Sequence, residues 1–490
     1  VRGVGGRVEG PQSPRADSML EVPWPRPRVR AALLLAAFSS ALAERPATGL
    51  RPAQGSDSPS HILVFDAGSS GTRIHVFNML PPRPGERVPA IDLSVRPNQT
   101  YKEKPGLSKF ARDGDLNGSQ VAIERLLNFA DTFVPKELRP HTPALLKATA
   151  GLRAVPSHLA EAVLERIRAT LASSEYAFCN SWAGIIPGAE EAGLAWVTAN
   201  YLEGTFDSGE SSVGVIEMGG GSTQVTFQVD EPDLIPQSDR FDFTTVSGQR
   251  YHLYAHSYPG YGQDYAQEAL QQRIPAESSE DPCYPLGYQR GVTTLVKGSG
   301  NAEACESLVQ GFFAESEQAP GSYHAGPSLS GRFVATENFV HARHDLSLPL
   351  EGGVDSMSKA AVQACQHAAE ETPTDPMKPN FCFALAYQVA FLSALGVRQD
   401  GGVDVRIAEK INGSDLDWAV GAALVHALGQ QRCPPQSTLS FLPGPPEGYT
   451  PWFVALFGAM VITAMLVRRF LPRIHRHPGV SGPWQPSKLP

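Results

Sequence analysis

The sequence predicts an α/β protein made of two related lobes with a cleft between them. Two stretches carry this prediction, H-I-L-V-F-D-A-G-S-S-G-T-R-I-H-V-F over residues 61–77 and S-V-G-V-I-E-M-G-G-G-S-T-Q-V-T-F over 212–227. Each is an apolar strand, a carboxylate (Asp66 or Glu217), a turn of small residues and a second β-rich strand. Because strand and helix patterns alternate from His61 onward, the two hairpins are expected to belong to two α/β halves.

Composition is that of a globular protein with more than one domain. The chain has 490 residues, 19% of them charged, and a formal net charge of −9. This balance provides no basic surface for nucleic acid, so a polyanionic ligand would have to be bound locally.

The N-terminal region reads as a secretory leader. The first methionine is Met19, so residues 1–18 are expected to be absent from the mature protein. Residues 19–43 have the three parts of a signal peptide: arginines, an apolar run and the small-x-small sequence Ala-Leu-Ala that ends at Ala43. An uncleaved membrane anchor is the alternative, but the apolar run is short for a span. Residues 44–60, rich in Pro, Ser and Gly, are expected to form a flexible linker.

Lobe I is expected over residues 61–186, joined by a returning segment at about 418–433, and lobe II over 187–417. Within lobe I the pattern predicts a buried strand at 144–149, then a turn and a helix that Ser157 caps. That helix should run to about Leu171. Further helices are expected at 190–200, 360–367 and 383–395.

Near the C-terminus the sequence predicts a membrane anchor. Residues 434–448 form a Pro/Gly-rich stalk, and 449–471 a transmembrane helix whose uncharged stretch lies at 452–467. A buried soluble helix is the alternative. The arginines that follow favour the membrane, because basic flanks stay cytoplasmic. Residues 472–490 would then be a cytoplasmic tail, and the body would be extracellular or in the Golgi lumen.

Sequons and cysteines agree with a secretory compartment. Asn98, Asn117 and Asn412 each begin an Asn-x-Ser/Thr sequon. The six cysteines contain no C-x-x-C pair, so disulfides are expected rather than a zinc site. Six cysteines allow fifteen pairings. Local pairing would join Cys283 to Cys305 and Cys365 to Cys382, which leaves Cys179 with Cys433.

The turn residues of the two hairpins suit a polyphosphate. Glycines let a turn pack close to a ligand, and successive backbone N–H groups form an anion-binding concavity. Hydroxyls would add donors, and the two acids could hold a divalent metal through water. Asp and Gly favour turns anyway, so one copy alone would be a weak signal. Two matched copies favour a site for a polyphosphate and its cation.

Two further segments add chemistry between the hairpins. In Ala-Thr-Ala-Gly-Leu-Arg (148–153), Thr149 would offer a hydroxyl to the cleft, and Arg153 would support a phosphate or a carboxylate. Glu190 and Glu191 begin a predicted helix, where acids favour the helix dipole in any protein. Beside two phosphate-binding turns, however, a carboxylate would supply the general base that hydrolysis by water requires.

These motifs together resemble the apyrase-conserved regions of the ecto-apyrase family, the nucleoside triphosphate diphosphohydrolases. The matching regions, in order, are 66–73, 148–153, 188–202, 217–224 and the Trp-Ala-Val-Gly-Ala stretch from Trp418. Order and spacing match from about residue 61 to residue 430. Two segments between them, 256–262 and 281–288, also resemble that family.

The resemblance implies two actin/hexokinase-like (RNase H-type) lobes with a nucleotide in the cleft. It implies removal of terminal phosphates from nucleoside tri- and diphosphates, with Ca²⁺ or Mg²⁺. By position, Glu191 would be the general base, Ser222 and Gln224 would position the attacking water, and Thr149 would lie near the reacting phosphate. Such in-line phosphoryl transfer needs positioning and charge neutralisation more than a protein nucleophile.

The resemblance assigns the remaining site residues by position. Asp66 and Glu217 would hold the hydrated metal. Arg73, Arg153 and Trp418 would support the site, and Tyr387 is a weaker candidate for stacking on the base. The turns that cradle the phosphates comprise Ser69, Ser70, Gly71, Thr72, Gly219, Gly220, Gly221 and Thr223.

The chain departs from the family pattern at two positions. Glu217 stands where the family usually has Asp, and Ala192 replaces the usual glycine after the base, where it would press on the nucleotide or on the helix start. The Gly-Thr-Arg-Ile-His run that begins at Gly71 resembles the secreted, Golgi and plant branches of the family more than the animal cell-surface ones. Besides an apyrase, the sequence therefore leaves open a Golgi nucleoside diphosphatase for UDP or GDP, and a non-catalytic nucleotide-binding protein. A kinase is disfavoured, because the general base would be aimed at water.

Overall fold

The computed structural model describes residues 60–81, 83–94, 99–274, 280–290, 296–316, 326–345, 353–367, 380–397, 402–429 and 433. The chain divides into two units, Val1–Asp57 and Ser58–Pro490, and every described residue belongs to the second. The predicted leader, signal peptide, stalk, transmembrane helix and tail lie outside these ranges, as do almost all of the linker and Asn98. Within the ranges above, no helix is long and apolar enough to cross a membrane.

The first hairpin belongs to a five-stranded sheet. Its strands, in the order β3-β2-β1-β4-β5, are β1 (His61–Ala67), β2 (Thr72–Asn78), β3 (Thr100–Glu103), β4 (Ala144–Ala148) and β5 (Ala183–Ile185). Strands β1 and β2 are antiparallel, whereas β1, β4 and β5 are parallel. Successive residues of β1 enter different core clusters, Ile62 and Val64 on one side and Leu63 and Phe65 on the other. The sheet is therefore covered on both faces, which explains why β1 reads as a continuous apolar run.

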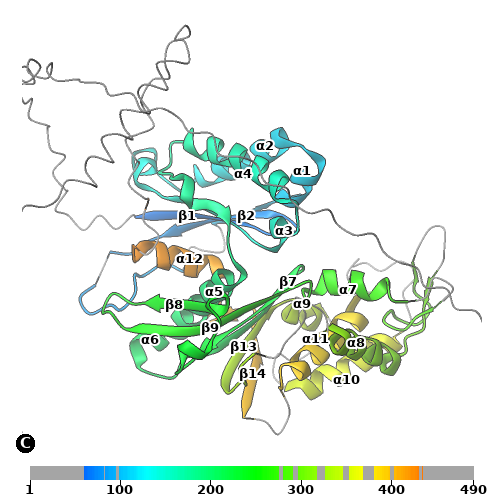
Figure 1. Ribbon diagram of the computed structural model, residues 1–490. Coiled ribbons are helices and arrows are strands. Elements are labelled where there is room, and N and C mark those ends of the chain that lie inside the picture. Colours follow the sequence, from blue (N-terminus) through cyan, green and yellow to red (C-terminus); the bar gives the residue numbers. More distant parts are fainter. Residues whose placement is uncertain are drawn as a thin grey trace, which may run out of the picture. The chain divides into compact units, whose positions relative to one another are not determined.

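Helices cover one face of this sheet (Figure 1). They are α1 (Leu107–Asp113), α2 (Leu116–Ala130) and α4 (Ser157–Ala172). The prediction that Ser157 caps α4 is wrong, because the cap position is Pro156 and Ser157 is the first helical residue. The predicted turn after β4 is instead a short helix, α3 (Ala150–Arg153). Two 3₁₀ helices complete this part, Lys136–His141 and Asn180–Trp182.

The second hairpin belongs to a six-stranded sheet. Its strands, in the order β14-β13-β6-β7-β9-β8, are β6 (Gly214–Met218), β7 (Ser222–Gln228), β8 (Arg240–Thr244), β9 (Arg250–Pro259), β13 (Gly331–Glu337) and β14 (Val403–Ile407). Like β1, strand β6 has an antiparallel hairpin partner on one side and a parallel strand on the other. The pairing around the two hairpins is therefore repeated, as expected of two related lobes.

A group of helices packs beside β13 and β14 (Figure 1). They are α7 (Gln263–Gln271), α8 (Ala302–Ser316), α9 (Asn338–Asp345), α10 (Gly353–Gln366) and α11 (Phe381–Ala394). The remaining short elements are β10 (Glu280–Asp281), β11 (Gln289–Arg290), β12 (Val296–Gly298), β15 (Lys410–Ile411), β16 (Ser414–Asp415), α6 (Thr205–Ser208) and the 3₁₀ turns Pro232–Leu234 and Gln237–Asp239.

Two helices lie between the sheets, α5 (Gly188–Glu203) and α12 (Trp418–Ala427) (Figure 1). Both are buried along most of their length, as expected of helices that are apolar all round. They pack very closely, because a Cβ added at Gly421 would lie 2.1 Å from the carbonyl oxygen of Leu194. The two helices are thereby held firmly against each other between the sheets.

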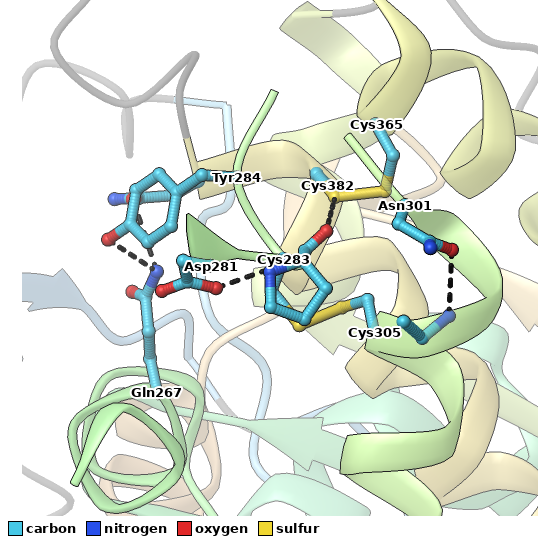
Figure 2. The surroundings of a disulfide bond; sticks show 11 residues. Gln267, Asp281, Cys283, Tyr284, Asn301, Cys305, Cys365 and Cys382 are labelled. Carbon is cyan, nitrogen blue, oxygen red and sulfur yellow. Dashed lines mark hydrogen bonds between the residues drawn. A yellow bond between two sulfur atoms is a disulfide. The ribbon is translucent and has the colours of Figure 1, made fainter. Parts of the chain in front are cut away.

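All three predicted disulfides are confirmed. Cys283–Cys305 fastens the segment after β10 to α8, and Cys365–Cys382 joins α10 to α11; Figure 2 shows both. Cys179–Cys433 links the segment before β5 to the chain beyond α12. It therefore holds the returning C-terminal segment against the first sheet.

Candidate active site

The turns of the two hairpins meet at a cavity of about 130 Å³. Glu191 in the first turn of α5 and Trp418 at the start of α12 also reach it. The cavity therefore brings together segments from the whole of the predicted site. The predicted residues that line it are Asp66, Ser69, Ser70, Gly71, Arg73, Thr149, Glu191, Glu217, Gly219, Gly220, Gly221, Ser222, Gln224 and Trp418.

The two acids occupy equivalent places in their hairpins. Asp66 lies directly opposite Arg73, and Glu217 directly opposite Gln224. Side chains opposite each other in a ladder share one face of the sheet. Each hairpin therefore presents a carboxylate and a hydrogen-bond donor to the cavity.

The second turn is held with its carbonyl groups pointing away from the cavity. The amides of Gln263 and Asp264 donate to the carbonyls of Gly219 and Gly220 at 2.9 and 3.0 Å, and the amide of Gly260 donates to Gly221 at 2.9 Å. A Cβ at Gly262 would lie 2.3 Å from the amide nitrogen of Ser222, so only glycine allows this approach. With its carbonyls engaged behind it, the turn can offer N–H groups to an anion.

The first turn is packed by two helix starts. A Cβ at Gly151 would lie 2.8 Å from Ser69 Cα, and one at Gly106 would lie 2.5 Å from the Ser69 carbonyl oxygen. Across the cavity, Ser69 Oγ is 3.5 Å from the position that a Cβ of Gly220 would take. The two turns therefore come close to contact at this point beside the cavity.

Glu191 belongs to a hydrogen-bonded group at the second turn. Arg153 Nη2 donates to Glu191 Oε2 at 2.5 Å and to Ser222 Oγ at 3.4 Å, and Gln224 Nε2 donates to Ser222 Oγ at 2.7 Å. Because Ser222 Oγ accepts both bonds, its own proton is available to another acceptor in the cavity. Burial raises the pKa of Glu191, and the charge of Arg153 opposes that shift. A carboxylate so placed can accept a proton from water near neutral pH.

Asp66 and Glu217 fit a hydrated divalent cation. Glu217 is 6% exposed, and its Oε2 atom is buried without a hydrogen-bond partner while its side chain lines the cavity. Burial raises the pKa of Asp66 to about 7 and that of Glu217 well above its ordinary value, as expected of carboxylates that await a cation. Among the described residues no three His, Cys, Asp or Glu side chains are close enough to enclose a metal. Oxygen ligands of this kind suit Ca²⁺ or Mg²⁺, with water and phosphate oxygens completing the shell.

Two predicted hydroxyls do not reach the cavity. Thr223 Oγ1 donates to the Tyr261 carbonyl at 2.7 Å, and Thr72 is 1% exposed and does not line the cavity. Thr72 is the first residue of β2 and Thr223 is the second residue of β7. Successive side chains of a strand point to opposite faces of the sheet. Since Arg73 and Gln224 face the cavity, the preceding threonines face away.

The prediction that Tyr387 stacks on the base is wrong. This side chain is fully buried in α11, stacks between Phe383 and Phe313, and donates its hydroxyl to the Tyr261 carbonyl at 2.8 Å. Tyr387 therefore supports the core of the second lobe instead of facing a nucleotide.

The residues beside Glu191 have structural partners. Ala192 is fully buried against Ala189 and Ala255, so it presses on neither the nucleotide nor the cavity. Glu190 pairs with Lys147 of β4 at 2.7 Å. This ion pair joins the first turn of α5 to the strand beside Asp66.

Sequence reasoning missed two charged residues that line the cavity, Lys102 and Glu337. Lys102 lies directly opposite Arg73 on β3, and its Nζ donates to Ser70 Oγ at 2.9 Å. Glu337 ends β13, the parallel neighbour of β6. Neither belongs to a motif, and only the pairing of β3 and β13 with the hairpin strands would have indicated them.

Comparison with known proteins identifies related chains. Residues 54–436 match the GDA1/CD39 (nucleoside phosphatase) family. "Probable apyrase 5" of Arabidopsis thaliana is 31% identical over 407 residues, which cover 74% of this chain and 81% of the plant protein. "Ectonucleoside triphosphate diphosphohydrolase 6" of Mus musculus is 31% identical over 397 residues, 76% of this chain and 83% of the mouse protein.

A human relative and a solved structure extend the comparison. "Nucleoside diphosphate phosphatase ENTPD5" of Homo sapiens is 29% identical over 393 residues, 75% of this chain and 88% of the human protein. A crystal structure of nucleoside triphosphate hydrolases from Neospora caninum shares the fold, with a TM-score of 0.57 and 16% identity over 76% of this chain and 93% of that one.

Proposed function

The chain belongs to the GDA1/CD39 (nucleoside phosphatase) family, and we propose that it is an apyrase that hydrolyses the terminal phosphates of nucleoside tri- and diphosphates. The observation that carries this proposal is the position of Glu191 beside Ser222 and Gln224, at a cavity walled by two glycine-rich turns. This arrangement provides a base for water and N–H donors for phosphate, which are the two things that in-line phosphoryl transfer requires.

The roles of the residues follow from their contacts. Arg153 orients Glu191, which takes a proton from the attacking water. Gln224 directs the Ser222 hydroxyl, whose proton is then free to bind that water or a phosphate oxygen. A divalent cation at Asp66 and Glu217 would neutralise charge on the phosphates. No covalent intermediate on the protein is required.

A preference for nucleoside diphosphates is the second candidate. It is supported by the human relative, which is named a nucleoside diphosphate phosphatase. The plant relative is named an apyrase. The two candidates differ only in the ratio of activity on ATP to activity on UDP or GDP.

We further propose that the catalytic body lies in the lumen of the secretory pathway or outside the cell, held by a single C-terminal helix at 449–471. Three disulfides support an oxidising compartment. Two sequon asparagines in the described part of the chain, Asn117 and Asn412, are exposed, as glycosylation requires. Asn412 also donates its side-chain amide to the Leu202 carbonyl at 2.8 Å, so Asn117 is the more accessible of the two.

Phosphate release tests the proposed activity. Residues 44–447 would be secreted and assayed on ATP, ADP, UDP and GDP with Ca²⁺, with Mg²⁺ and with EDTA. We expect turnover that EDTA abolishes and that Glu191→Gln lowers about 10²–10⁴-fold, because the general base is lost. Glu190→Gln is the matched control, since that carboxylate pairs with Lys147. A folded protein that binds nucleotide without hydrolysing it would refute the proposal in favour of a binding protein.

A further inference from the structure

Glu337 lines the active-site cavity from a position that no motif predicted. It is the last residue of β13, which pairs in parallel with β6 so that Glu337 lies opposite Met218 and Thr336 opposite Glu217. The carboxyl ends of parallel strands are where α/β proteins bind ligands. Glu337 therefore approaches the cavity from the strand next to that of Glu217.

The backbone at Glu337 is in an unfavourable conformation. Its φ is +60°, in the left-handed region that residues other than glycine rarely adopt. Such residues persist only where the surrounding structure enforces them, and they cluster at functional sites.

One buried side chain holds the backbone beside Glu337. Gln388, fully buried in α11, donates to the carbonyl of Asn338 at 2.7 Å and to Gln263 Oε1 at 2.9 Å. The amide of Gln263 in turn donates to the Gly219 carbonyl at 2.9 Å. The backbone after Glu337 and the second phosphate turn are therefore positioned by the same group.

The charges around the cavity do not balance. Four acids line it, Asp66, Glu191, Glu217 and Glu337, whereas the cations are Arg73 and Lys102 in the lining and Arg153, which is paired with Glu191. A nucleotide would add further negative charge. Glu217 Oε2, buried without a partner, is an independent sign that a cation belongs here.

We propose that Glu337 is a third carboxylate of the divalent-cation site, acting with Asp66 and Glu217 through the water shell of the metal. This inference rests on the proposed function, because it concerns the same cavity. Glu337 adds a negative charge that strengthens cation binding, and the two sheets then hold the cation between them. The competing role is that Glu337 serves only as a counter-ion for Arg73 and Lys102, whose charges also act on it.

Calcium binding by the full chain tests the proposal. Ca²⁺ would be titrated calorimetrically into the wild type, Glu337→Gln and Glu337→Asp, alone and with adenosine 5′-(β,γ-imido)triphosphate. Loss of an outer-shell carboxylate should weaken Ca²⁺ binding about 10–100-fold, whereas Glu337→Asp, which keeps the charge, should bind within a few-fold of the wild type. Glu165→Gln, an exposed glutamate on α4, is the matched control and should change nothing.

The outcomes separate this inference from the proposed function. If the wild type binds no Ca²⁺ even with the nucleotide analogue, the metal-dependent function fails, and the inference fails with it. If the wild type and Glu337→Gln bind Ca²⁺ equally, only the inference is overturned. Tighter binding of the analogue by Glu337→Gln in EDTA, with Ca²⁺ affinity unchanged, would establish the counter-ion role instead. Melting in EDTA checks that Glu337→Gln folds, and Glu337→Ser replaces it if it does not.

Discussion

Ser222 and Thr223 are neighbours whose hydroxyl groups face opposite sides of β7. Ser222 Oγ accepts from Gln224 inside the cavity, whereas Thr223 Oγ1 donates to the Tyr261 carbonyl in the core. Variants at these two positions can therefore separate the proposed effect on catalysis from an effect on stability.

Replacing these two hydroxyls should give opposite results. Ser222→Ala should lower kcat about 10²–10³-fold, the usual effect of losing one positioned donor, with little change in melting temperature. Thr223→Val should leave kcat nearly unchanged but destabilise the protein by about 0.5–1.5 kcal/mol, because the Tyr261 carbonyl loses one of its two donors and keeps the Tyr387 hydroxyl. Steady-state kinetics and denaturant unfolding of both variants check this. Equal kinetic losses would show that Thr223 also serves the phosphates.

The two residues that depart from the family pattern, Glu217 and Ala192, are both compatible with the predicted site. Glu217 retains the position of the usual aspartate at the end of β6 and lines the cavity. Ala192 packs against Ala189 and Ala255, so its methyl group costs the site nothing. The departures that motivated a non-catalytic alternative are therefore compatible with the arrangement of Glu191, Ser222 and Gln224.

At the scale of elements, the two glycine-rich turns of the cavity depend on the segments behind them. The start of α7 holds the second turn through Gln263 and Asp264, and Gly262 leaves room for the Ser222 amide. The geometry of the second turn is thus set by a helix that contributes no side chain to the predicted chemistry.

A methyl group at Gly262 should therefore displace the second turn. A Cβ there would lie 2.3 Å from the Ser222 amide nitrogen and 2.5 Å from two backbone carbons, none of which can rotate away. We expect Gly262→Ala to cost about 1–3 kcal/mol of stability and to raise KM while lowering kcat. Gly184→Ala is the control, because a Cβ at Gly184 would meet no atom within 4 Å. Wild-type kinetics from Gly262→Ala would mean that the turn does not need this contact.

Helices α5 and α12 act as one element although they lie far apart in sequence. Thr198 Oγ1 donates to the Asp417 carbonyl at 2.9 Å and accepts from the Gly421 amide at 2.9 Å. This contact fixes the start of α12, and so Trp418, relative to the helix that carries Glu191.

At the scale of the whole molecule, the cavity stores unfavourable charge that a cation can relieve. Asp66, Glu191, Glu217 and Glu337 all have raised pKa values, with burial as the main cause. At a pH between the ordinary and the raised pKa values, these carboxyl groups are therefore protonated more fully in the folded state than in the unfolded chain.

Stability without metal should fall as the pH rises. For Asp66 the free energy of unfolding should decrease between its ordinary pKa, about 4, and its folded value of about 7, because the folded state binds more protons in that window. Ca²⁺ binds the ionised carboxylates and should restore stability at pH 8 more than at pH 5. Denaturant unfolding at both pH values, with EDTA and with Ca²⁺, measures the difference. Equal stability at the two pH values in EDTA would contradict the raised pKa values.

The sequence by itself determined the local elements and most of the site. The two acid-turn hairpins and the disulfides Cys283–Cys305 and Cys365–Cys382 follow from residue types and spacing, because turn chemistry, strand alternation and the pairing of nearby cysteines are short-range properties. Cys179–Cys433, 254 residues apart, followed only as the remaining pair, and the role of Glu191 was indicated by the family resemblance. Alternation along β2 and β7 would also have turned Thr72 and Thr223 away from the cavity once Arg73 and Gln224 were placed in it.

Only the tertiary structure decided which distant segments complete the site. Lys102 and Glu337 reach the cavity through strand pairing, and Tyr387 leaves it because α11 is buried on all sides. Strand order and helix packing depend on contacts between residues far apart in the chain, which no local pattern records. The charge balance of the cavity, and hence the proposed role of Glu337, is a property of the assembled fold.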